Sequence, residues 1–146
     1  GLGGSGSEVE SAFPEGEALI VFHRLRLVDG EPTGTQSVAI PRDIADACSI
    51  TPDFLQRPDS SLYERFASGG VILVEAEETL TAVTATRQES RVLKTEPHAA
   101  LIEVVRQSRS AQQRLVEVVQ ARYLGSAYLY RVRLGVNVQS GKGMAT

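Results

Sequence analysis

The 146-residue sequence predicts an α+β fold, in which a six-stranded, largely antiparallel sheet is flanked by helices. Two observations indicate this fold. Two segments that each have the pattern of a β-hairpin repeat at an offset of about 82 residues. Both helix-capping signatures of the chain fall in the stretch between these two segments.

The first predicted hairpin runs from Pro14 to Pro41, where the apolar run ALIVF leads through HRLRLV to the turn DGEP and then to TGTQSVAIP. The second begins at Pro97 with ALIEVVRQSRS and returns through RLVEVVQARYL. Each copy has a proline, then Ala-Leu-Ile, then a run of apolar residues with an arginine at the matching place, Arg24 and Arg106. Two related hairpins predict an antiparallel sheet.

Three helices are predicted between the hairpins. The stretch PRDIADAC places Pro41 in a first helical turn, where proline is well tolerated. Ser61 and Glu64 have capping-box spacing at the start of SLYERFA, and Thr86 and Glu89 have it at the start of TRQESRV. Between the last two helices, GGVILVEAEETLTAVTA predicts one long strand, and SAYLYRVRLGV alternates near the carboxyl end as the sixth strand.

One domain is expected between residues 14 and 136, since the chain is long enough for a single hydrophobic core. Residues 1–13 have the glycine- and serine-rich composition of a linker, and residues 137–146 that of a frayed tail. The linker-like start predicts that the chain was cut from a longer protein.

Composition excludes several classes of protein. A net charge of −3 lacks the basic footprint of a nucleic-acid-binding domain, and no apolar run approaches the ~20 residues of a membrane helix. The single cysteine, Cys48, cannot form an internal disulfide, which fits a cytoplasmic protein. Glu75, Glu77 and Glu78 have no histidine at ligand spacing, so we expect neither a metal nor a cofactor.

Arg24 and Arg26 are the first candidate site residues. Strand alternation puts both on one face of the first hairpin, among apolar neighbours. A half-buried guanidinium needs a partner and two adjacent ones repel each other, so a phosphate or carboxylate is a natural third group. The alternative is that both are solvated or pair with Asp29 and Glu31.

Glu117 and Tyr123 share a face of the last return strand, because six residues separate them. A carboxylate and a phenol at this spacing could hydrogen-bond a hydroxylated ligand. The alternative is a cross-strand ion pair and an ordinary core tyrosine.

In their order and spacing, these motifs resemble the UTRA domain, the effector-binding half of HutC-type regulators in the GntR family. The resemblance rests on ALIVFHRLRLVDGEP followed by AIP, on SLYERF, on VEAEETLTAV leading into RQESRVLKTEP, and on VEVVQARYLGSAYLYRVRL. It implies a chorismate-lyase-like fold. It also implies a winged helix-turn-helix domain ahead of this one in the full-length regulator.

The resemblance also implies roles for single residues. Arg24 and Arg26 correspond to arginines that hold an anionic effector group, such as a sugar phosphate or a carboxylate. Gln36, Glu117 and Tyr123 correspond to further effector-binding positions of the family.

Several positions depart from the family pattern. Gln36 replaces a carboxylate, and Thr81, also an effector-site position, stands where many relatives have glutamate. Leu124, Ser126 and Ala127 replace three charged residues of the common motif. The resemblance therefore predicts the location of the pocket, while the lost charges predict a different and less polar effector.

The function implied is that of the ligand-sensing and dimerisation domain of a bacterial repressor whose DNA binding is modulated by a small metabolite. DNA would be bound only through the separate N-terminal domain, and a homodimer suits a two-fold operator. We expect no enzymatic activity and no membrane contact. Two alternatives stay open: a chorismate-lyase-like enzyme on the same fold, and a pure dimerisation module.

Overall fold

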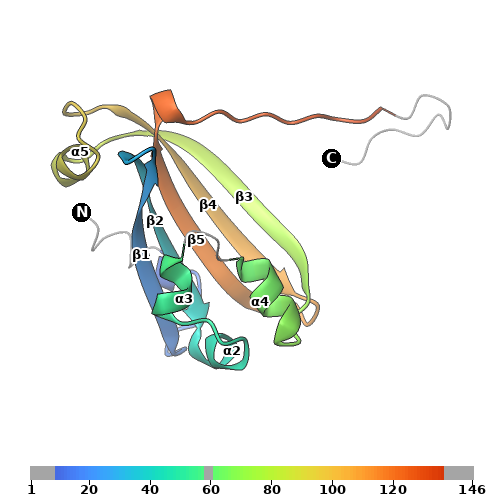
Figure 1. The fold of residues 1–146 in the computed structure, drawn as a ribbon. Helices are drawn as coiled ribbons and strands as arrows, with labels where there is room; N and C mark the ends of the chain where they lie inside the picture. Colours follow the sequence, from blue (N-terminus) through green and yellow to red (C-terminus); the bar gives the residue numbers. More distant parts are fainter. Residues whose placement is uncertain (1–8, 58–60, 137–146) are drawn as a thin grey trace.

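The computed structural model describes residues 9–57 and 61–136, which form one antiparallel sheet with short helices packed on it (Figure 1). The described strands follow the order β1-β2-β5-β4-β3 across the sheet, and every neighbouring pair is antiparallel. The strands are β1 (Leu19–Val28), β2 (Glu31–Pro41), β3 (Leu73–Thr84), β4 (Ala100–Ser110) and β5 (Leu115–Leu124).

Both predicted hairpins are present, as β1-β2 and β4-β5, and their inner strands β2 and β5 pair at the centre of the sheet. This order relates the two hairpins by an approximate two-fold axis. Arg24 on β1 and Arg106 on β4 therefore occupy equivalent places on the two outer strands of the four.

The sheet has five strands in the described residues rather than the predicted six. After β5 the chain forms a short 3-10 helix, η1 (Gly125–Ala127), and residues 128–136 then run without pairing to the sheet. Figure 1 shows this segment leading away from the body of the domain. Its alternating pattern does favour an extended backbone, but a strand also needs hydrogen bonds to a neighbouring strand, and residues 128–136 pair with no strand of their own sheet.

The helices are short, and their ends follow the capping signals. Thr86 and Glu89 form a complete capping box, with hydrogen bonds of 2.9 and 3.1 Å, and the Ser61 hydroxyl accepts from the Glu64 backbone N–H. A helix that we did not predict follows the N-cap Thr51, whose side chain accepts from a backbone N–H. Four helices lie wholly within the described residues: α2 (Arg42–Ala47), α3 (Pro52–Gln56), α4 (Leu62–Ser68) and α5 (Arg87–Val92).

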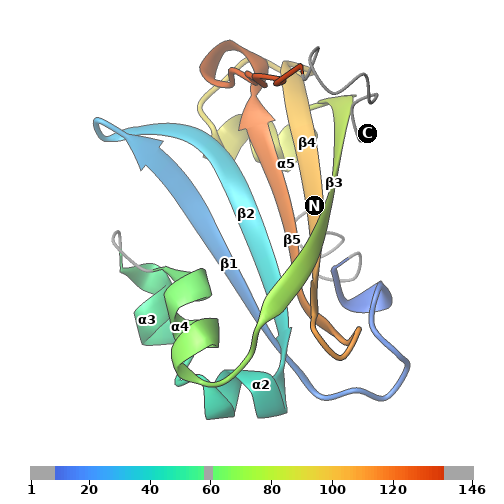
Figure 2. The ribbon, with the colours of Figure 1, turned by 90° about the vertical axis from the view of Figure 1, so that its right-hand side faces the viewer.

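Helices α2, α3 and α4 cover one face of the sheet, which we call the helix face (Figure 2). Phe54 and Phe66 pack there against Val38 and Val119 from the two central strands. No helix among the described residues has the length and apolar character needed to cross a membrane.

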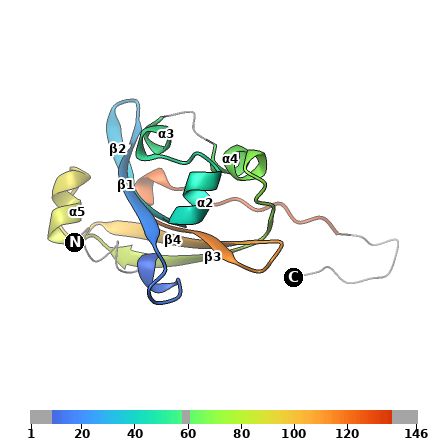
Figure 3. The ribbon, with the colours of Figure 1, turned by 90° about the horizontal axis from the view of Figure 1, so that it is seen from below.

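The opposite face, which we call the far face, is covered by the start of the described chain and by α5 (Figure 3). Val9 and Phe13 are buried there against Ala39 and Val118. Residues 9–13 belong to the stretch predicted as a linker, so the packed part of the chain begins before residue 14. Glycine and serine dominate only the first seven residues. The prediction extended this linker composition too far along the chain and so missed the packing of Val9 and Phe13.

Candidate functional site

A concavity of about 270 Å³ lies on the helix face, between the sheet and helices α3 and α4. Strands of the two hairpins form its floor, and residues of α3 and of the start of α4 form its wall. Its apolar lining residues are Phe22, Val38, Leu55, Leu62 and Val119, and its polar ones include Arg24, Gln36, Tyr63 and Arg106. We call this concavity the arginine pocket.

Arg24 enters the arginine pocket from β1, where it is the direct cross-strand partner of Gln36 on β2. Its Nη1 donates a hydrogen bond to the backbone oxygen of Leu55 in α3, at 3.0 Å. Burial lowers the pKa of the Arg24 guanidinium, and repulsion from the neighbouring Arg26 lowers it further. Among the described residues Arg24 forms no ion pair, so none of their carboxylates neutralises its positive charge.

Arg106 enters the same pocket from β4, on the other side of the central strands. Its Nη2 lies 3.5 Å from Oε1 of Glu117, and its guanidinium carbon lies 5.8 Å from the centre of the Tyr63 ring. Its Nε is buried and has no hydrogen-bond partner in the structure. A buried N–H without an acceptor is costly, so an acceptor from a bound ligand would be stabilising here.

Sequence reasoning did not assign Arg106 to a site, although the internal repeat matches it to Arg24. The two-fold relation of the hairpins carries both arginines to one face, because each lies on an outer strand at an equivalent register. The repeat, combined with strand alternation, was therefore a signal that could have found Arg106.

Glu117 lies beside the arginine pocket and is 1% exposed. Its Oε1 accepts a hydrogen bond from the Ser108 hydroxyl at 2.9 Å and pairs with Arg106. The cross-strand ion pair that we left open as an alternative is thus present. In this arrangement the carboxylate fixes the position of the Arg106 guanidinium.

Tyr123 lies on the helix face but outside the arginine pocket, on the side of the pocket that faces the β1-β2 turn. It stands opposite Gly34 on β2, where a Cβ atom would approach Cδ1 of the Tyr123 ring to 2.7 Å. Its ring also stacks on Tyr128 of the segment after η1, with 5.2 Å between the ring centres. Glycine at position 34 is therefore required for the observed placement of the tyrosine.

Arg26 is exposed and lies outside the arginine pocket. It lines a neighbouring surface concavity of about 400 Å³, together with Arg24, Gln56 and Arg57. Neither Arg26 nor Arg24 pairs with the acidic residues of the adjacent turn, in the part of the chain that the structure describes.

Thr81 is not brought to the arginine pocket, because its side chain belongs to the far face. Thr81 pairs in register with Glu103, and Glu103 with Arg122. The Nε of Arg122 lies 2.7 Å from Oε2 of Glu89, in the helix α5 that covers the far face. Leu80 and the residue after Thr81 lie on the helix face instead, so the strand register separates Thr81 from the other candidates.

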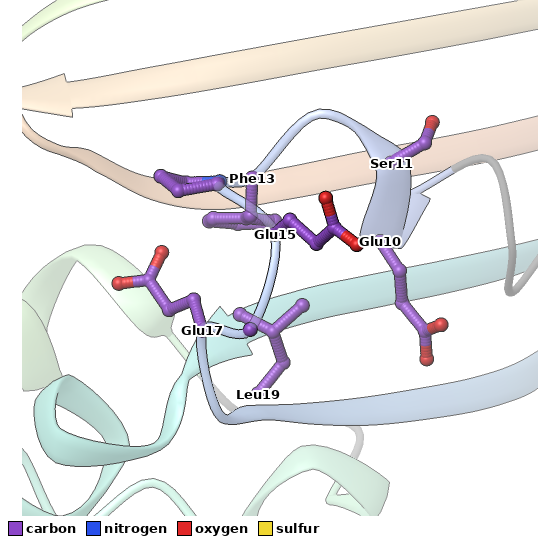
Figure 4. A pocket seen from close by; sticks show the side chains of 8 residues that line it. Glu10, Ser11, Phe13, Glu15, Glu17 and Leu19 are labelled. Carbon is purple, nitrogen blue, oxygen red and sulfur yellow. The ribbon is translucent and has the colours of Figure 1, made fainter.

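A larger concavity of about 520 Å³ lies near the start of the described chain (Figure 4). Its lining includes Glu10, Glu15 and Glu17, and Glu17 pairs with Arg114 at 3.0 Å. Several carboxylates at one surface would repel an anion. Within residues 9–57 and 61–136, no group of histidine, cysteine or acidic side chains is arranged to hold a metal ion. The arginine pocket, in contrast, combines cationic side chains with an apolar floor, and this chemistry suits a small anionic ligand.

Comparison with known protein families identifies the fold around this pocket. The family model described as UTRA domain matches residues 10–129. The chain belongs to the UTRA domain family. No curated protein sequence matches it.

Solved structures agree with this assignment. The UTRA domain is 29% identical to the ligand-binding domain of a putative GntR-family transcriptional regulator from Bordetella bronchiseptica, with a TM-score of 0.72 over 88% of this chain and 80% of that one. It is 27% identical to a putative transcriptional regulator from Streptomyces coelicolor, with a TM-score of 0.65 over 77% of this chain and 74% of that one. A GntR-family regulator from Enterococcus faecalis, 21% identical, shares the fold with a TM-score of 0.67 over 77% of this chain and 78% of that one.

These findings establish the class of function. The UTRA domain is a ligand-sensing, regulatory domain of the kind found in GntR-family transcriptional regulators, and it is not an enzyme. The chorismate-lyase-like enzyme, kept as an alternative above, is not favoured.

Proposed function

We propose that the arginine pocket binds a small organic anion, such as a sugar phosphate or a carboxylate, and that its occupancy regulates a HutC-type repressor. The observation that carries this proposal is the convergence of Arg24 and Arg106 on one concavity from opposite sides. Arg24 forms no ion pair in the described chain, and Arg106 has a buried Nε without an acceptor. An anion would neutralise the first group and supply an acceptor to the second.

The spacing of the two arginines bears on the shape of the ligand. Strands β2 and β5 separate β1 from β4, so the backbones of Arg24 and Arg106 lie three strand spacings, ~14 Å, apart across the sheet. The floor between them is apolar, from Val38 and Val119. This arrangement suits a short ligand with an anionic group at one end and a polar group at the other. A volume of about 270 Å³ limits it to a small metabolite.

Gln36 bears on the charge of the ligand. A carboxylate at this position would lie directly across from Arg24 and could pair with it. The amide of Gln36 cannot neutralise a guanidinium, so Arg24 stays available to an anion. The loss of this carboxylate therefore favours an anionic effector over the less polar one that the lost charges first suggested.

The test is a binding screen of phosphorylated sugars, carboxylates and neutral metabolites by thermal shift, with hits measured by calorimetry. For an anionic hit, Gln36→Glu is expected to weaken binding at least tenfold, because the new carboxylate competes for Arg24. Gln88→Glu, an exposed change on α5, is the matched control and should leave the affinity within twofold. Binding of neutral compounds alone, or an anion equally well bound by Gln36→Glu, would contradict the anionic site.

We further propose that the domain acts as a homodimer, and that DNA is contacted only by a winged helix-turn-helix domain elsewhere in the full-length repressor. An effector then shifts the equilibrium between two arrangements of the paired DNA-binding domains by binding one of them more tightly. A mobility-shift assay of the full-length regulator, with and without the anion, tests this. An operator affinity that the anion leaves unchanged would count against it.

A further inference from the structure

The segment that follows η1 exposes a row of apolar side chains. We call residues 128–136 the C-terminal arm. Its five large exposed hydrophobic residues are Leu129, Tyr130, Val132, Leu134 and Val136, between 52% and 76% exposed. Figures 1 and 3 show the arm projecting from the domain. A contiguous apolar surface of this kind is typical of an interaction site.

Strand β3 offers an unpaired edge. It is the last strand of the sheet and pairs only with β4, so the backbone groups on its outer side have no strand partner among the described residues. Ten of its twelve residues are exposed, including Val74 at 55% and Leu80 at 37%. Between Glu75 and Thr84 it contains neither a proline nor a register shift. A long edge without these protections is a template for another strand.

The charges of the arm and of this edge are complementary. In the arm, Arg131 and Arg133 alternate with the apolar residues, so an extended backbone puts both arginines on one face. On β3, Glu75 and Glu77 share the far face, since they pair with Arg109 and Gln107 of β4. The edge strand at the other side of the sheet, β1, carries arginines at its own exposed end. Charge therefore favours β3 over β1 as the partner of the arm.

We propose that the arm of each chain pairs antiparallel with the β3 edge of a second copy, so that two chains exchange arms in a symmetric dimer. This inference rests on the homodimer of the proposed function and names its contact surface. A two-fold axis makes the two contacts identical, so each chain contributes one arm and one edge. The sheet of each copy gains a sixth strand, the one that the sequence pattern predicts.

One register between the arm and β3 brings opposite charges together on one face of the strand pair and apolar residues together on the other. With Arg131 opposite Glu77, Arg133 falls opposite Glu75. The apolar residues of the arm then lie on the helix-face side of β3, with Val132 beside Ala76.

The arm does not continue along its own sheet. Its first residues, Tyr128 and Tyr130, lie beside β3 at Leu80, Thr81 and Ala82. Beyond this point the arm continues away from the sheet (Figure 1). Within the described residues the arm makes no strand pairing with its own β3, so its backbone is available to the edge of a second copy.

Charge reversal tests the pairing. One double variant reverses the arm (R131E and R133E) and the other reverses the edge (E75R and E77R). All four positions are exposed, so folding should be retained, and circular dichroism verifies this. By light scattering and sedimentation, the parent should be a dimer. The dissociation constant of the dimer should be at least tenfold higher for each double variant. A matched variant on α5, R87E with R91E, should keep the dimer of the parent.

Mixing the two double variants gives the decisive measurement. A reversed arm then meets a reversed edge, and a parent arm meets a parent edge, so both contacts of a heterodimer are complementary. Native mass spectrometry should detect this heterodimer, because the two chains differ in mass.

Two results would overturn the exchange of arms. If the parent is a dimer that neither reversal weakens, and mixing yields no preference for the heterodimer, the interface lies elsewhere while the proposed homodimer stands. If the parent is a monomer at high micromolar concentration, both the arm exchange and the homodimer are wrong.

Discussion

Replacing Arg24 with methionine separates a ligand-binding role from a structural one. Methionine has a similar length and no charge, so the change removes the guanidinium and keeps much of the packing against the apolar floor of the pocket. If Arg24 serves the fold, the domain without ligand should lose stability. If it serves an anionic ligand, the main loss should appear only when the ligand is present.

In the absence of ligand, the two effects of the change oppose each other. The variant loses the 3.0 Å hydrogen bond to the Leu55 oxygen, and a hydrogen bond from a charged group contributes ~1.5–3 kcal/mol. It also removes a charge that is disfavoured by burial and by repulsion from Arg26, the two causes that lower the pKa of Arg24. We expect the free energy of unfolding to stay within ~1 kcal/mol of the parent.

With ligand, the effects no longer cancel. An anion at 100 times its dissociation constant stabilises the parent by ~2.7 kcal/mol. Loss of one charged hydrogen bond, ~1.5–3 kcal/mol, weakens binding roughly 10- to 150-fold. At the same ligand concentration the variant then gains only ~0.3–1.4 kcal/mol. At about 3 °C per kcal/mol, the ligand-induced rise in melting temperature falls from ~8 °C to ~1–4 °C.

The assay is differential scanning calorimetry of the parent, Arg24→Met and the remote control Arg87→Met, each with and without an anionic hit. A guanidinium stays protonated at every practical pH, and a carboxylate ligand stays ionised above pH 6. For a carboxylate hit, the difference between the two ligand-induced rises should therefore be the same between pH 6 and 9. An equal rise for the parent and Arg24→Met would refute contact between Arg24 and the ligand. A loss of more than ~3 kcal/mol without ligand would instead assign Arg24 to the fold.

Three further predictions concern the fold. Phe13→Ala should cost ~3–5 kcal/mol in urea unfolding, because Phe13 is 6% exposed; a loss below 1 kcal/mol would mean that the start of the chain is not packed. Gly69→Ala should cost ~1–3 kcal/mol, because its Cβ would lie 2.4 Å from Sγ of Cys48, and an unchanged melting temperature would contradict this contact. The hydrogen bond from Arg114 lowers the pKa of Asp43, so its contribution is present above the ordinary carboxyl pKa and is lost as pH falls through the lowered one. Asp43→Asn should therefore lower the free energy of unfolding by less than ~1 kcal/mol at pH 7, because Asp43 is exposed, and should not lower it in strong acid. A destabilisation that grows as the pH falls would contradict this prediction.

Much of the fold follows from the sequence alone, because the signals involved are local. The turn Asp29-Gly30, the N-caps Ser61 and Thr86, and the alternation along each strand depend on residues a few positions apart. They predicted both hairpins, the α+β class, and three of the four helices that lie wholly within the described residues. The short helix after Thr51 was missed, although Thr51 followed by proline is an N-terminal capping signal.

The arrangement of the elements needed tertiary structure. Alternation predicted that Arg24 and Arg26 share a face, but only the strand order brings Arg106, 82 residues away, to the same pocket. Alternation likewise cannot say which face of β3 meets the helices, and the pairing with β4 puts Thr81 on the far face. The class of function could be predicted without the tertiary structure, because the resemblance to the family depends only on the order of motifs along the chain.

The arm shows the same division. Its sequence determines an extended, amphipathic segment, because alternating arginines and apolar residues suit a strand. Whether such a segment pairs, and with which edge, depends on where the preceding turn directs it and on which edges are left unpaired. Those are properties of the assembled sheet, because strand pairing joins residues that are distant in the chain.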